Sequence, residues 1–129
     1  MTQIDDLLNR SVDDLYAELG FELAGTEVGE DGAVRRTSAG AMPPSPKKAR
    51  ENGISIFQTL NLKINRTLCE EWDACAKIQN DFSNADPRQL VVVVSDVLSA
   101  VFLGIPVVII SAIVVKIGIH KFCDCPSTS

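Results

Sequence analysis

The residues best suited to chemistry are four cysteines and one histidine. Cys69 and Cys75 lie mid-chain, whereas His120, Cys123 and Cys125 lie near the end. Thiolate and imidazole groups are the usual zinc ligands, and four of them complete a tetrahedral site. Residues six apart on a helix point about 120° away from each other, so the first two cysteines converge only if the helix is distorted. We therefore predict no metal site or other cofactor, with these five residues as the only candidate ligands.

The cysteines are expected to be reduced. The first ten residues, MTQIDDLLNR, contain neither the basic nor the apolar region of a secretory signal, so we expect the bulk of the chain to stay where it is made. Thiols in such a compartment are kept reduced. The sequence therefore predicts that Cys75 packs in a core and that Cys123 and Cys125 form a free terminal pair.

No catalytic pattern is visible. His120 is the only histidine, and nothing in its surroundings pairs it with a nucleophile and an orienting carboxylate. Paired acids at 5–6, 13–14 and 70–71 are sequence neighbours, so on a helix their side chains diverge by about 100°. A glycine-rich phosphate loop is also missing. The sequence predicts a non-enzymatic protein and identifies no small-molecule substrate.

Charge is unevenly distributed along the chain. Residues 1–31 carry nine acidic side chains against one basic, whereas residues 32–89 carry nine basic against six acidic. The net charge of the whole chain is −5. A nucleic-acid-binding domain is normally basic, so we expect no nucleic-acid partner.

The N-terminal part is expected to form an arm with little stable structure. Apolar side chains recur every three or four residues over 1–20, which predicts a short acidic amphipathic helix. Ser11 with Asp14 offers a cap for a still shorter helix. Residues 21–54 are rich in glycine, alanine, proline, serine and charge, which predicts a flexible linker. A basic run lies in this linker: Arg35, Arg36, Lys47, Lys48 and Arg50.

Residues 55–84 show the most regular helical signal. Ser55 and Gln58 have the spacing of a helix cap, and the apolar residues that follow recur every three or four positions. A long amphipathic helix with one apolar face is predicted. We expect this face to contact a partner or another part of the chain: Leu60, Ile64, Leu68, Trp72, Cys75 and Phe82.

Residues 86–122 form a hydrophobic block that has to be buried. Asp86 followed by Pro87 is a typical helix start. Gly104 and Pro106 have the order of a helix stop and restart, so the block is either one kinked helix or a hairpin of two. A short tail, residues 123–129, follows. The fold class predicted for the whole chain is all-α.

A lipid bilayer is the expected environment of this block. The nineteen residues 97–115 are uncharged, close to the roughly 20 that span a bilayer. Thirteen of them are Val, Leu, Ile or Phe, which makes insertion favourable. The predicted membrane segment is marked by these residues: Val97, Phe102, Pro106, Ile110 and Val115.

Two alternatives to a single span stay open. In a hairpin, Ser95, Asp96 and Ser99 share one helix face and could line a polar seam between several copies in a membrane. Equally, the hairpin could bury its apolar faces against the stripe of residues 60–82, giving a soluble three-helix domain.

The leading functional hypothesis is a small membrane-associated protein that presents a helical interaction surface. Its alternatives are a membrane-active effector, holin-like or pore-forming, and a soluble helical interaction module with the hairpin as its core. We expect a lipid bilayer and either a protein partner or self-association. The expected location is a membrane with the N-terminal region cytoplasmic, and the alternative is the cytoplasm.

Overall fold

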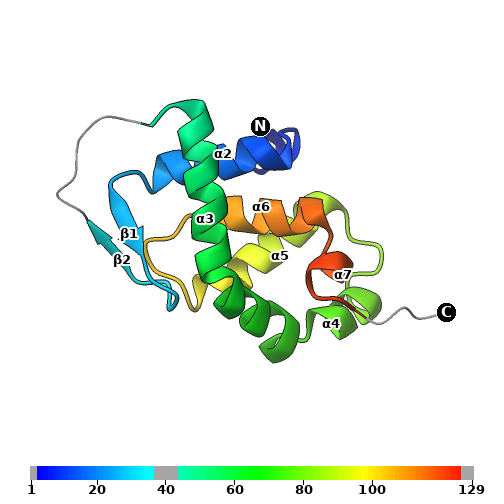
Figure 1. Cartoon of the computed structure of the whole chain (residues 1–129). Helices are drawn as coiled ribbons and strands as arrows, with labels where there is room; N and C mark the ends of the chain where they lie inside the picture. Colours follow the sequence, from blue (N-terminus) through cyan, green and yellow to red (C-terminus); the bar gives the residue numbers. More distant parts are fainter. Residues whose placement is uncertain (1–2, 37–43, 126–129) are drawn as a thin grey trace.

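The computed structural model describes residues 3–36 and 44–125. These residues are mostly helical, as the sequence predicts. They form seven α-helices, a π-helical segment and two short strands (Figure 1), in this order: α1 (Gln3–Leu8), α2 (Val12–Glu22), β1 (Thr26–Val28), β2 (Val34–Arg36), α3 (Pro46–Asn65), η1 (Arg66–Glu71), α4 (Ala74–Asn80), α5 (Pro87–Ser99), α6 (Val107–Ile117) and α7 (Ile119–Phe122).

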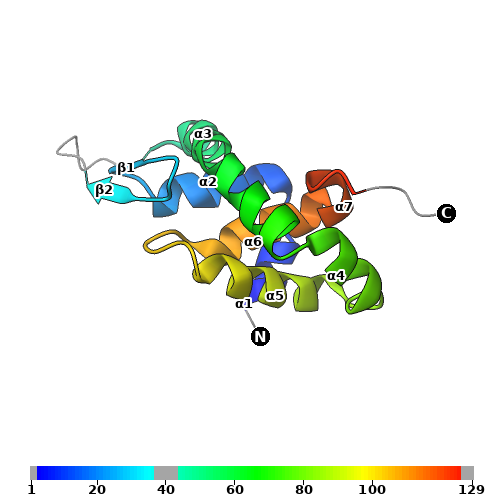
Figure 2. The same cartoon turned by 90° about the horizontal axis from the view of Figure 1, so that it is seen from below.

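Helix α6 is the centre of the core. Six consecutive residues, 109–114, are buried, so no side of this stretch faces solvent. Helices α1, α2, α5 and α7 pack against it, and Figure 2 shows it in the interior of the molecule. A helix that is apolar on all sides has to be enclosed in this way.

The hydrophobic block is a hairpin of two helices rather than one continuous span. Helix α5 ends at Ser99, and the chain turns through residues 100–106 before α6 begins. Gly104 takes a positive φ of 76° in the turn, a conformation that glycine adopts without steric cost. Pro106 directly precedes α6 and has no N–H for a continuing helix.

The residues expected in a membrane instead lie in or against the core of the chain. Phe102 and Ile110 are buried, and Val97, Pro106 and Val115 are half-buried. Over residues 3–36 and 44–125, no helix combines the length and the apolar character needed to cross a bilayer.

The expected arm and linker are largely ordered. Leu7, Leu15 and Leu19 from α1 and α2 belong to the core, and Ser11 caps α2 by accepting a hydrogen bond from the Asp14 N–H. Strands β1 and β2 pair antiparallel, with Val28 opposite Val34. Helix α3 begins at Pro46 instead of near Ser55 because Ser45 caps it. Residues 37–43 of the expected linker lie outside the described residues, as do residues 126–129 of the tail.

The charges of the basic run are mostly on the surface. Arg35 and Arg36 are exposed on β2, Lys47 and Lys48 are exposed in the first turn of α3, and Arg50 is half-buried. The run is therefore divided between a strand and a helix rather than lying on one flexible segment.

Helices α2 and α3 cross at two buried glycines. A Cβ added at Gly20 would overlap the backbone carbonyl of Ala49, and one added at Gly53 would overlap that of Tyr16. The two backbones therefore touch where side chains would normally separate them. This close crossing holds α3 against α2.

We predict that Gly53→Ala destabilises the protein. The new methyl group pushes α3 away from the Tyr16 carbonyl, at a cost of about 1–3 kcal/mol, and this strain outweighs the gain of up to about 1 kcal/mol in helix propensity. Urea denaturation measures the change in free energy of unfolding. Ser55→Ala on the exposed face of α3 is the control and should leave stability nearly unchanged. Equal stability of the two variants would contradict the close crossing.

Candidate functional site

The most prominent surface feature is the side chain of Leu103, at the tip of the α5–α6 turn. Leu103 is 86% exposed, more than any other large apolar side chain in the described parts of the chain. The turn itself is anchored, because Phe102 and Ile105 on either side are buried. A Cβ added at Gly32 would collide with the Phe102 ring, so the ring lies directly against the β1–β2 turn. Leu103 is thus presented to solvent by a well-packed loop.

Leu103 belongs to a larger apolar surface, which we call the Leu103 surface: Val34, Leu62, Val101 and Leu103. Leu62 on α3 is 63% exposed. Val101 lines two adjoining hollows, one of about 380 Å³ shared with Leu62 and one of about 520 Å³ shared with Val34 and Leu103. Three elements far apart in sequence, β2, α3 and the α5–α6 turn, meet at this surface.

Charged side chains border the Leu103 surface. Glu30 and Asp31 lie on the β1–β2 turn, and Arg66 and Glu71 lie on η1. Lys63 joins α3 to the turn, because its Nζ donates a hydrogen bond to the Asp31 backbone carbonyl at 2.6 Å. The same ammonium lies 5.1 Å from the centre of the Phe102 ring, within range of a cation–π interaction. Lys63 therefore holds together the elements that form the surface.

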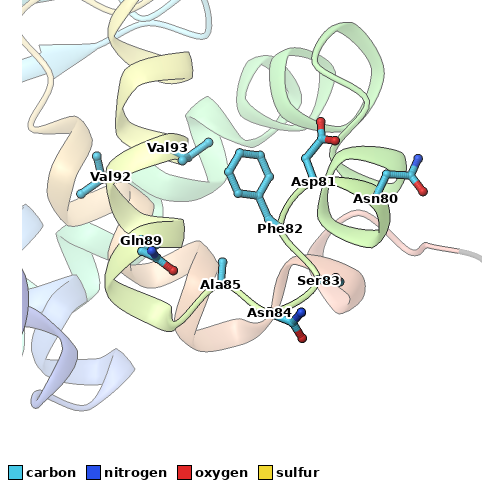
Figure 3. Close-up of a pocket in the computed structure, with 9 residues that line it drawn as sticks. All are labelled: Asn80, Asp81, Phe82, Ser83, Asn84, Ala85, Gln89, Val92 and Val93. Carbon is cyan, nitrogen blue, oxygen red and sulfur yellow. The ribbon is translucent and has the colours of Figure 1, made fainter.

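A third hollow, of about 670 Å³, lies between the α4–α5 connection and α5 (Figure 3). Phe82 lies beside Val93 in it, while the side chains of Asn80, Asp81 and Asn84 point in different directions. The Gln89 side chain already accepts a hydrogen bond from the Asp86 N–H, and the Asp86 carboxylate accepts one from the Gln89 N–H, so the two residues cap the start of α5. The polar groups of this hollow do not converge on one point, so its geometry suits neither a metal ion nor a small polar ligand.

The cysteines form two disulfides, which corrects the expectation of reduced thiols. Cys69 pairs with Cys123, and Cys75 pairs with Cys125. No described cysteine is free. His120, the fifth candidate metal ligand, is exposed on α7. Among the described side chains, no group of three or more His, Cys, Asp or Glu residues could hold a metal ion.

A local distortion brings Cys69 and Cys75 to the same partner segment. Segment η1 winds as a π-helix, in which the Trp72 N–H donates to the Thr67 carbonyl five residues earlier, at 3.0 Å. Asp73 then takes a left-handed backbone with φ of 58°, before α4 begins. Six residues on a regular helix would separate the two cysteines by about 120°. The π-helical turn of η1 and the left-handed backbone of Asp73 change the angle between the two cysteines about the helix axis. Both sulfur atoms therefore reach the segment after α7.

The predicted interaction face is mostly used inside the chain. Leu60, Ile64 and Leu68 are fully or almost fully buried in the core, so they are not open to a partner. Trp72 and Phe82 are half-buried, with ring centres 6.1 Å apart. Cys75, the remaining member of this face, is in a disulfide. The apolar period correctly marks a buried stripe, but the partner of that stripe is the chain itself.

The predicted polar seam is not gathered on one contact surface. Asp96 and Ser99 are exposed, and the Ser99 hydroxyl donates to the Asp96 backbone carbonyl at 2.9 Å. The Ser95 hydroxyl is buried and has no hydrogen-bond partner among the residues that the structure describes, and the same holds for the Ser111 hydroxyl on α6. Asp96 therefore faces solvent in this structure.

Burial raises the pKa of Tyr16, and the Asp13 carboxylate adds to the rise. The Tyr16 ring makes an edge-to-face contact with Phe57, with ring centres 5.7 Å apart. Tyr16 lies on α2 at the crossing with α3, so this shift reflects helix packing rather than a reactive site.

Comparison with known proteins identifies no relative: no family model, curated protein or solved structure matches the chain. The Leu103 surface was not foreseen from the sequence. Leu103 lies within the hydrophobic block, among other apolar residues. The only local sign of its exposure is its position beside Gly104, where the sequence predicts a break between two helices.

We predict that the native protein contains no reactive thiol among its four cysteines. Iodoacetamide added to the unfolded, unreduced protein should label none of them, and prior reduction should expose all four. Reduction should lower the free energy of unfolding by about 2–5 kcal/mol for each of the two disulfides, the usual effect of losing one disulfide in a small domain. Mass spectrometry of the peptides checks labelling and pairing. Labelling of Cys69 or Cys123 without reductant would contradict the structure.

Proposed function

We propose that this chain is a non-enzymatic protein-interaction module that binds a partner protein through the Leu103 surface. The observation that carries the proposal is the near-complete exposure of Leu103 on an anchored turn. An exposed leucine that becomes fully buried contributes about 1.5–3 kcal/mol. A partner with an apolar pocket would gain this free energy.

The anchoring of the turn supports a binding role. Phe102 and Ile105 are buried on either side of Leu103, and Lys63 fixes the adjacent β1–β2 turn. A side chain that is already held in its bound position loses little conformational entropy on association. The surface is therefore suited to form a specific contact.

The border of the surface favours a protein over a bilayer. Of the exposed charged residues that line its two hollows, Glu30, Asp31 and Glu71 are acidic and only Arg66 is basic; Arg35 and Arg36 are exposed farther along β2 and line neither hollow. Cytoplasmic membrane surfaces are negative and attract basic segments. The hydrophobic block is also used in the core, which removes the main reason to propose a membrane anchor. The two disulfides support action in an oxidising compartment, where such bonds persist.

We predict that Leu103→Ser removes partner binding whereas Val92→Ser does not. Val92 is the matched control because it is an apolar side chain that is 45% exposed and lines the hollow between the α4–α5 connection and α5, away from the Leu103 surface. Immobilised wild-type protein and both variants are incubated with extract of the source cells, and retained proteins are quantified. A protein lost only with Leu103→Ser is then purified, and its Kd is measured by calorimetry.

The expected Kd is at least about tenfold weaker for Leu103→Ser, since burial of leucine is worth more than 1.4 kcal/mol. Val92→Ser should bind like the wild type, and circular dichroism should show that all three proteins are folded. Equal retention by wild type and Leu103→Ser, or loss only with Val92→Ser, would refute the proposal.

A further inference from the structure

We infer that the Leu103 surface binds a segment of its partner in which an apolar side chain stands next to a cationic one. This inference rests on the proposed function and adds the chemistry of the partner. It is drawn from the hollow that Leu62 and Val101 line together with the carboxylates of Glu30, Asp31 and Glu71.

The apolar part of this hollow is formed by α3 and the α5–α6 turn. Leu62 is largely exposed there, although helix α3 has buried positions on its other face. Val101 lines the same hollow as Leu62. It also lines the adjoining hollow together with Leu103, so the apolar surface is continuous from Leu62 to Leu103. At about 380 Å³, the hollow lies within the roughly 300–1,000 Å³ of typical ligand pockets. It is large enough for an apolar side chain of a partner.

The carboxylates come from two separate elements. Glu30 and Asp31 approach from the β1–β2 turn, and Glu71 approaches from η1. All three residues are exposed. The Asp31 carboxylate also accepts a hydrogen bond from the Ala33 N–H at 3.0 Å, which fixes its direction within the turn. Acidic groups from two separate elements therefore line the same hollow as Leu62 and Val101.

The basic side chains of the hollow do not balance these carboxylates. Lys63 is half-buried and uses its ammonium on the Asp31 backbone carbonyl and on the Phe102 ring. Arg66 is the one exposed cation that lines this hollow. Lys63 keeps its positive charge in these contacts, so three carboxylates face two cations and the hollow carries a net charge of −1. Opposite charge across an interface raises the association rate and selects among partners, so a cationic segment fits this hollow better than an acidic one.

The test uses fluorescein-labelled peptides of about twelve residues, long enough for an extended or helical contact. One peptide alternates Leu with Lys, a second replaces Lys by Glu, and a third replaces Leu by Ser. Fluorescence anisotropy measures the Kd for the folded, oxidised protein at low and at physiological ionic strength. We expect the Leu/Lys peptide to bind more tightly than either control peptide, and added salt to weaken this binding.

Two double variants locate the contact. Glu30→Gln with Glu71→Gln removes two border charges and should weaken the Leu/Lys peptide at least about tenfold. Glu22→Gln with Glu51→Gln is the matched control, since it removes the same charge from exposed positions on α2 and α3. It should leave the Kd within about twofold of the wild type at physiological ionic strength, because neither residue lines the hollow and salt screens exposed charges.

Equal binding of the Leu/Lys and Leu/Glu peptides, or an equal effect of the two double variants, would overturn the inference. The inference can fail while the proposed function stands. If Leu103→Ser abolishes binding of the natural partner while the Glu30 and Glu71 variant retains it and the Leu/Lys peptide does not bind, the surface is an interaction site for a partner of different chemistry.

Discussion

Burial of α6 is the constraint on which the rest of the structure depends. Its residues 109–114 are all buried, so a neighbouring element is needed on every side. Helices α1, α2, α5 and α7 supply this cover. Even the Ser111 hydroxyl is enclosed without a hydrogen-bond partner, an arrangement that costs on the order of 1–3 kcal/mol. The apolar packing of the helix has to outweigh that cost, which shows how strongly this chain depends on enclosing its most hydrophobic segment.

Two devices keep the cover of α6 in place. Gly20 and Gly53 allow α2 and α3 to approach until their backbones touch. Helix α2, which covers α6, is therefore packed closely against α3. Helix α7 has only four residues, too few for a stable helix of its own. The disulfides from Cys123 and Cys125 fasten the segment after it to η1 and α4. The distorted backbone of η1 and Asp73 is the geometric condition for both bonds.

Local signals in the sequence were more informative than spacing over long distances. The caps at Ser11 and Asp86 could be predicted because a cap involves residues three apart. The start of α3 was misplaced although the cap at Ser45 is also a local signal; Ala49 and Gly53 are recognisable as helix-contact residues only when α2 is known to lie against them. The disulfides were missed because the thiols were expected to be reduced, and a regular helix gives the wrong phase for Cys69 and Cys75. Length and composition predicted burial of residues 97–115, which is right for the two helices but wrong for the turn that carries Leu103. They also do not distinguish lipid from protein as the surroundings.

The exposure of Leu103 follows from the same constraint. Because α5 and α6 both bury an apolar face, the turn between them has to emerge at the end of the core. The side chains of Phe102 and Ile105 are buried in that core. Leu103, between Phe102 and Gly104, is left exposed to solvent. A polar residue there would meet solvent at no cost, whereas a leucine leaves apolar area in water that only a further contact can remove. The anchored turn thus connects the enclosure of α6 with a binding role: the interactions that fix the core also hold one apolar side chain ready for a partner.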